Sequence, residues 1–110
     1  MINLQKKPAE FRNGYKNKQR LSDLHLIPCS LCYKLGKQQT SRTTAHHQIG
    51  LGLGLKASDE LCMSLCDNHH QKGQDAIHHI GRTRFEEKFC SQEELIKITN
   101  ELLTNIECNY

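Results

Sequence analysis

The chain has 110 residues, the size of one domain, and its apolar content of 36% includes no Trp, three Phe and three Tyr. A small domain with so few large apolar side chains usually needs disulfides or a bound metal to be stable. The N-terminal residues lack the apolar run of a secretion signal, and no segment has the roughly 20 apolar residues that span a membrane. We therefore expect a cytoplasmic domain whose six cysteines serve metal ligation rather than disulfides.

The net charge of +3 is small but unevenly distributed. Residues 1–20 carry six Lys or Arg side chains against one Glu, and the chain from Glu86 onward is net acidic. A basic segment suits a polyanionic partner such as DNA or RNA, although a solvated tail that maintains solubility explains it equally well. We expect residues 1–21 to form a basic, largely irregular arm, 22–90 the core, and 91–110 a C-terminal packing helix.

In chain order, residues 21–28 are apolar enough to pack against the core, and we expect His25 to be structural rather than a ligand. Residues 34–49 predict a turn followed by a strand, because their threonines favour extended backbone. The next segment, GLGLGLKASDE, lacks the G-x-G-x-x-G spacing and the βαβ surroundings of a dinucleotide loop. A flexible loop is expected there.

From about Leu65 a short helical turn is expected to carry the central histidines. Capping-box spacings at Thr83–Glu86 and Ser91–Glu94 predict two helix starts. The second opens the segment SQEELIKITNELLTNIE, which has an apolar stripe made of Leu95, Ile98, Leu102 and Ile106, with Leu103 beside it. This stripe predicts a helix that packs in the core or against a second copy of the chain.

Four residues have the spacing of a structural zinc site with two tight turns: Cys29, Cys32, Cys66 and His69. Cys62 is the alternative, since it could replace His69 as the fourth ligand or remain a buried thiol. Cys90 and Cys108 lie far from these turns in the sequence and are expected to be free thiols.

Five further histidines are available for a second site: His46, His47, His70, His78 and His79. Adjacent residues of a strand point to opposite faces, so one of the pair at 46 and 47 can bind a metal while its neighbour acts as a base. His70 directly follows a predicted zinc ligand, so the zinc would fix its position.

The ordered set C-x-x-C, AHH, a Gly-rich loop with Lys and Asp, LC-x-x-HH, IHxxGR and FE resembles the HNH endonucleases, also called His-Me finger or ββα-metal nucleases. The likeness is greatest to the phage and prophage Ref-type recombination nucleases and covers about Ser22 to Phe89. It implies an α+β fold, with a small zinc-stabilised ββα-metal (HNH) core, a basic N-terminal arm and a C-terminal helix.

The resemblance also implies roles for individual residues. The matched positions are three ligands of a catalytic divalent metal, His46, His70 and His78, and one general base, His47. His78 is the best match, because AIHHIGR aligns with IHxxGR, and His79 is the alternative. The chain departs from the family at one point: many HNH proteins place this histidine four residues after the previous ligand, where this chain has Gln74.

The expected activity is metal-dependent hydrolysis of DNA phosphodiester bonds as single-strand nicks, and the resemblance implies 5′-phosphate and 3′-hydroxyl products. An imidazole with a pKa near neutrality suits removal of a proton from water, and a divalent cation stabilises the charge on the phosphate. Imidazole ligands favour Mn²⁺, Ni²⁺ or Zn²⁺, with Mg²⁺ a candidate working ion. Arg82 and Arg84 are expected to contact flanking phosphates, or else to form a salt-bridged helix start; Lys56 and Lys72 are weaker candidates.

The expected partner is DNA, single- or double-stranded, in the cytoplasm of a bacterial host that carries the phage or prophage. A recombination-protein partner and a dimer both remain open, and no membrane is involved. A zinc-stabilised, non-catalytic nucleic-acid-binding module is the main alternative, and an interaction module that docks through its C-terminal helix is another. The intact pair at His46 and His47 argues against a purely binding role.

Overall fold

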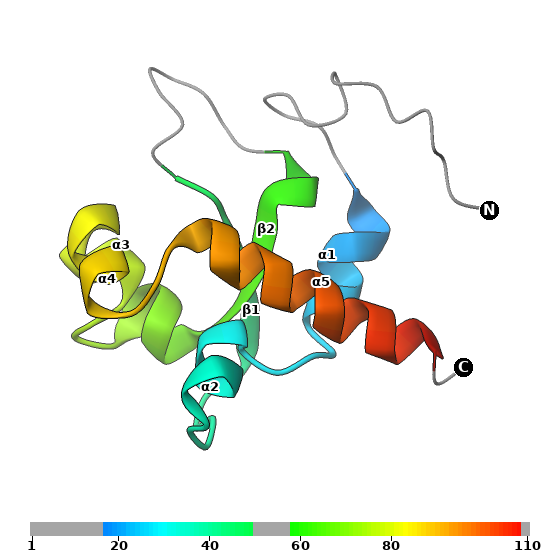
Figure 1. The fold of residues 1–110 in the computed structure, drawn as a ribbon, viewed down its shortest axis with the longest axis horizontal. Helices are drawn as coiled ribbons and strands as arrows, with labels where there is room; N and C mark the ends of the chain where they lie inside the picture. The colour runs from blue at the N-terminus through cyan, green and yellow to red at the C-terminus, as the bar shows by residue number, and fades with distance from the viewer. Residues whose placement is uncertain (1–16, 50–57, 109–110) are drawn as a thin grey trace.

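Two short antiparallel strands lie at the centre of the fold, with five α-helices around them in the computed structural model, which describes residues 17–49 and 58–108 (Figure 1). Strand β1 is Thr43–His47 and strand β2 is Cys62–Cys66. Their register pairs Thr43 with Cys66 and His47 with Cys62. The expected strand near the histidine pair is thus present, and the molecule is a small α+β domain.

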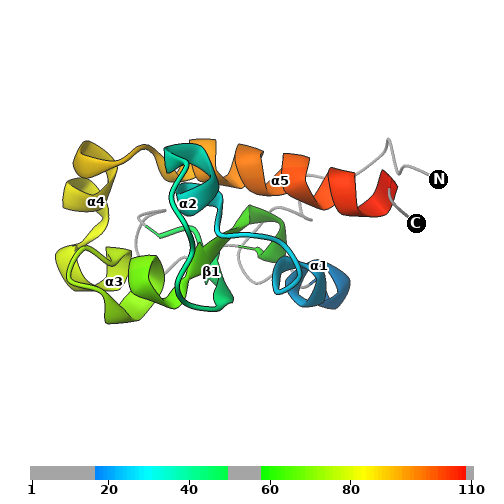
Figure 2. The same cartoon turned by 90° about the horizontal axis from the view of Figure 1, so that it is seen from below.

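The helices follow in chain order around this hairpin. The elements are α1 (Lys18–Leu24), α2 (Ser30–Leu35), the 3-10 turn η2 (Asp59–Leu61), the π-helical turn η3 (Asn68–Lys72), α3 (Ile77–Ile80), α4 (Arg82–Lys88) and α5 (Gln92–Cys108). Helix α1 lies at one end of the sheet and α3 and α4 at the other, while α5 runs along one side (Figures 1 and 2). The central histidines therefore occupy the α3 end of the molecule.

Strand β2 is the most buried element, since all five of its residues are buried. Helices α2 and α5 pack against it, which explains why Leu31, Leu65 and Leu95 are completely inaccessible to solvent. A strand buried on both faces reads as a continuous apolar run rather than as an alternating one. Burial of β2 fixes the end of the strand, where Cys66 leads into η3.

The predicted C-terminal helix is present as α5, and its stripe packs in the core. Leu95 and Leu102 are buried. Ile98 and Leu103 are partly buried against a core cluster formed by Leu24, Ile27, Cys62 and Leu102. Ser91 caps the helix by accepting a hydrogen bond from the backbone N–H of Glu94 at 3.2 Å. The side chain of Ile106 lies outside the described part of the structure.

Two local predictions were wrong. Residues 18–21 were expected to be irregular, but they are helical, because Asn17 caps α1 and its backbone N–H donates to Asp59 at 2.6 Å. The capping box at Thr83 does not form: α4 starts after Gly81, whose φ of 89° suits glycine, and without a side-chain cap. Glu86 instead accepts a hydrogen bond from the backbone N–H of Gln92 at 2.9 Å.

The remaining expectations about organisation concern residues outside the described ranges. The basic arm up to residue 16, the Gly-rich loop at 50–57 and Lys56 within it all lie there. Among the helices of the described ranges, none combines the length and the apolar character that a membrane crossing requires.

Candidate metal centres

The four predicted zinc ligands meet in one place. Cys29 and Cys32 lie at the start of α2, Cys66 ends β2 and His69 belongs to η3. The Nδ1 atom of His69 lies 3.7, 3.6 and 3.3 Å from the sulfurs of Cys29, Cys32 and Cys66, and the last two sulfurs are 3.9 Å apart. One thiol or imidazole donor from each residue is therefore available around a common centre.

The separations between these donors fit a tetrahedral zinc ion. With Zn–S bonds of about 2.3 Å and Zn–N bonds of about 2.0 Å, tetrahedral geometry requires sulfur–sulfur separations of about 3.8 Å and sulfur–nitrogen separations of about 3.5 Å. The four distances between donor atoms, from 3.3 to 3.9 Å, lie around these values. The cluster could hold a metal ion such as zinc, and three thiols with one imidazole form a donor set that zinc favours.

Burial favours the uncharged forms of these donors unless a cation is bound. All four residues are buried, and burial raises the pKa of the thiols of Cys29 and Cys32. Burial lowers the pKa of His69, so its imidazole is held neutral. Metal ligation requires thiolate and neutral imidazole, and a bound cation supplies the charge that stabilises buried thiolates.

A second group consists of three imidazoles from three different elements. His46 comes from β1, His70 from η3 and His78 from α3. Their ring centroids form a nearly regular triangle with sides of 4.9, 5.0 and 4.9 Å, and one nitrogen from each ring lies within 4.8 Å of the others. These three residues form the imidazole triad. His79 does not belong to this group, so the structure favours His78 between the two alternatives.

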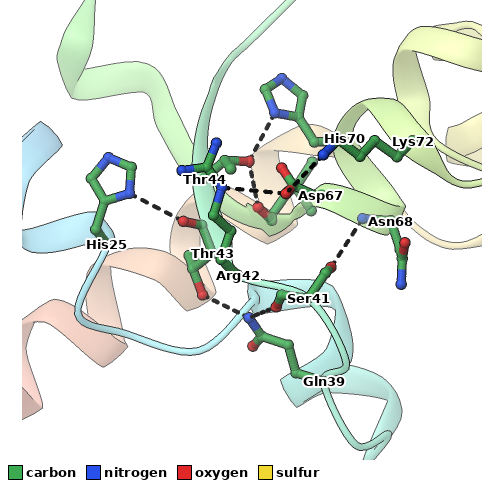
Figure 3. Close-up of polar contacts among 11 residues, drawn as sticks. His25, Gln39, Ser41, Arg42, Thr43, Thr44, Asp67, Asn68, His70 and Lys72 are labelled. Carbon is green, nitrogen blue, oxygen red and sulfur yellow. Dashed lines mark hydrogen bonds and ion pairs between the residues drawn. The ribbon is translucent and has the colours of Figure 1, made fainter.

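Hydrogen bonds define which nitrogen of two triad histidines can bind a metal. The hydroxyl of Thr44 donates to the carbonyl of Leu65 at 2.7 Å, so its oxygen accepts from Nδ1–H of His70 at 2.8 Å (Figure 3). The lone pair of His70 is then on Nε2. A protein acceptor that fixes the tautomer of a histidine in this way is typical of metal ligands.

Gln92 does the same for His46. The amide of Gln92 donates from Nε2 to the carbonyl of Ile49 at 2.9 Å, and its Oε1 accepts from the Ile49 N–H at 3.0 Å. These bonds fix the orientation of the amide, so Nε2–H of His46 donates to Oε1 at 3.2 Å and leaves the lone pair on Nδ1. Gln92 is completely buried at the start of α5, and nothing in the sequence pattern singled it out.

Burial favours the neutral forms of His46 and His70. It lowers the pKa of His46 to about 3 and that of His70 to about 4, and the neighbouring imidazoles lower both further. Neutral imidazoles keep a lone pair, so His46 and His70 are suited to bind a cation rather than an anion.

His47 belongs to a third group, with Asp59 and Cys62. Its Nε2 lies 2.7 Å from Oδ1 of Asp59, and the other oxygen of Asp59 accepts the backbone N–H of Asn17. Cys62 therefore does not join the other cysteines, and of its two predicted alternatives the structure favours the buried thiol. Burial raises the pKa of this thiol to about 12.

The other predicted residues lie outside these groups. Arg82 forms an ion pair with Glu86 at 3.1 Å, and Arg84 is exposed on α4. His25 contacts the carbonyl of Thr43 through Nδ1 at 3.1 Å and lies in no ligand group of the described residues, in keeping with a structural role. Cys90 is a partly buried free thiol, and the side chain of Cys108 is not described.

Comparisons with protein-family models, curated proteins and solved structures found no significant match to this chain. What can be said of its function therefore depends on the chemistry of the three groups.

Replacing Gln92 with Leu should weaken divalent-metal binding by the triad about 10- to 100-fold, as for other residues that orient metal-bound histidines. Leucine cannot accept a hydrogen bond from Nε2–H of His46, so the ring loses its fixed tautomer. Titration with Co²⁺, followed by its visible absorption in zinc-loaded protein, measures this change. Glu93→Gln is the control, because Glu93 is an exposed neighbour on the same helix. Equal affinity in Gln92→Leu and the parent would contradict the assigned role.

Proposed function

We propose that the protein is a metal-dependent DNA endonuclease of the HNH (ββα-metal) kind, which nicks DNA and leaves 5′-phosphate and 3′-hydroxyl ends. The observation that carries the proposal is the convergence of His46, His70 and His78 beside a separate imidazole–carboxylate pair. The cluster of Cys29, Cys32, Cys66 and His69 could hold a structural zinc ion by itself, so the triad is not needed for that role. A zinc-stabilised binding module has no use for this second arrangement.

The order of elements also supports this proposal. Two triad ligands lie on an antiparallel hairpin and the helical turn after it, which is the strand–strand–helix order that the name ββα-metal describes, and the third, His78, lies on the next helix, α3. His46 occupies the first strand and His70 the helical turn. Such an arrangement would bring the hairpin and the turn to one divalent ion.

His47 is the proposed general base. Its Nε2–H donates to the carboxylate of Asp59, which leaves Nδ1 with a lone pair for a water proton. The carboxylate holds the ring in this tautomer and stabilises the imidazolium that forms, as the aspartate of a catalytic triad does. His47 also lies within electrostatic reach of the triad, because it lowers the pKa of both His46 and His70.

The triad would hold a divalent ion through Nδ1 of His46, Nε2 of His70 and one nitrogen of His78. When bound, such an ion supplies positive charge that stabilises the phosphate in the transition state and the departing 3′ oxygen. Neutral imidazoles suit Mn²⁺, Ni²⁺ or Zn²⁺, while Mg²⁺ prefers oxygen ligands. We place the activity in DNA processing or recombination of a phage or prophage, in the cytoplasm of its bacterial host.

The function is tested by counting metals in purified protein and by plasmid nicking with Mg²⁺, Mn²⁺ or Ni²⁺. We expect one tightly held zinc and nicking that requires an added ion. His78→Ala should reduce nicking at least about 100-fold, whereas His79→Ala should not, since only the first residue belongs to the triad. These adjacent histidines make a matched pair of variants.

One zinc without nicking under any ion would overturn the nuclease proposal in favour of a binding module. Equal loss of activity in His78→Ala and His79→Ala would instead contradict the ligand assignment.

A further inference from the structure

We propose that Arg42 and Lys72 form a phosphate-binding pair that holds the nucleic-acid backbone beside the imidazole triad. The inference rests on the proposed function for its choice of ligand, a DNA strand. For this task the sequence favoured Arg82 and Arg84, with Lys72 as a weaker candidate, and it did not single out Arg42.

Both cations meet at one carboxylate oxygen. Nε of Arg42 lies 3.3 Å from Oδ2 of Asp67, and Nζ of Lys72 lies 3.8 Å from the same atom (Figure 3). Two positive charges thus share one negative charge, so the group as a whole carries a surplus positive charge. The side chains of Arg42 and Lys72 are 78% and 72% exposed, while that of Asp67 is only 13% exposed. The surplus positive charge is therefore on the two exposed side chains, where a binding partner can contact it.

In three other ion pairs of the described residues, the positive charge is neutralised one to one. Each cation has a carboxylate of its own: Lys34 with Glu94, Arg82 with Glu86, and Lys88 with Asp75. Such one-to-one pairs leave little local surplus charge. The contact with Asp67 uses only Nε of Arg42, so the terminal amino groups of its guanidinium can make the bidentate contact that a phosphate accepts.

The backbone places this pair beside the triad. The carbonyl of Arg42 accepts the N–H of Asp67 at 3.0 Å, so the hairpin ladder continues to the residue that starts the turn into η3. Two residues farther along β1, the hydroxyl of Thr44 holds Nδ1 of His70. The pair and a triad ligand are therefore fixed to the same short stretch of β1 and η3 (Figure 3).

A purely structural role is a poor explanation for this arrangement. Exposed ion pairs contribute little to stability, because water screens them and two long side chains must be ordered. Phosphate contacts by contrast gain from exposed cations, since each neutralised phosphate releases counterions into solution. An anchored carboxylate that holds two exposed cations together pre-organises them for such a ligand.

The test measures binding of a labelled DNA duplex by fluorescence anisotropy over a series of salt concentrations, with zinc-loaded protein and no other divalent ion. The variant is the double substitution R42Q/K72Q. The control is K18Q/K97Q, which removes the same charge from exposed residues of α1 and α5. Zinc content and melting temperature show that both variants keep the fold.

We expect R42Q/K72Q to weaken binding at low salt and to reduce the slope of log affinity against log salt by about 1.8, the loss of two phosphate contacts. K18Q/K97Q should leave that slope close to the parent value. Equal slopes in the parent and R42Q/K72Q, with nicking by the parent intact, would overturn the phosphate-binding pair alone, as would an equal change in the control. No DNA binding or nicking by the parent would overturn the proposed function and the pair with it.

Discussion

His47→Ala should lose nicking by about 100- to 10,000-fold, the usual contribution of a positioned general base. Alanine has no group to accept the proton of the attacking water. The side chain of His47 is 31% exposed and lies outside both metal-ligand sets, so its removal should leave the zinc count, the melting temperature and metal binding by the triad unchanged. Single-turnover nicking with saturating Mn²⁺ measures the effect on the chemical step.

Asp59 provides a second variant that separates positioning from structure. Asp59→Asn keeps the shape of the side chain but cannot stabilise an imidazolium as a carboxylate does, so we expect a smaller fall in the nicking rate than in His47→Ala. In the double variant the two losses should not add, because Asp59 acts through His47. Nicking by His47→Ala at the parent rate would refute the assignment of the base.

Cys29→Ser should yield a chain that neither retains zinc nor unfolds cooperatively. Structural zinc contributes apparent binding free energies of about 10–16 kcal/mol in zinc-finger peptides, as large as the whole net stability of a typical domain, about 5–15 kcal/mol. The sulfur of Cys29 is fully buried at the start of α2, and it also accepts the N–H of Cys32 at 3.4 Å. Circular dichroism during heating, together with a zinc count, measures the loss.

Cys90→Ser is the matched control for this experiment. Cys90 is only partly buried and lies outside the ligand groups of the described residues, so this variant should keep its zinc and its melting transition. A zinc-free Cys29→Ser protein that still unfolds cooperatively would contradict the structural role of the cluster.

The grouping of the ligands could be predicted because the information is local. Cys29 and Cys32 share one turn, and Cys66 and His69 share another, so spacing alone pairs them within each half. The residues that orient the histidines could not be predicted in this way. Gln92 lies 46 residues from His46, Thr44 lies 26 residues from His70, and each becomes a partner only when α5 and η3 pack against the hairpin.

The unexpected helix α1 and the missing capping box of α4 have similar causes. The cap of α1 is supported by the contact between Asn17 and Asp59, which are 42 residues apart. Glu86 has the spacing of a capping box, but its carboxylate is engaged by Gln92 and Arg82 instead. Sequence spacing describes which bonds a side chain can form, whereas packing decides among them.

His69 and His70 are adjacent in η3, yet one belongs to the Cys3His cluster and the other to the triad. No intervening residue lies between His69 and His70, so a displacement of one site also moves the other. On the proposed assignment, a newly synthesised chain therefore matures in a fixed order, with zinc loading ahead of catalytic competence. A zinc-starved cell would accumulate inactive protein, and supplying more of the catalytic ion would not restore its activity.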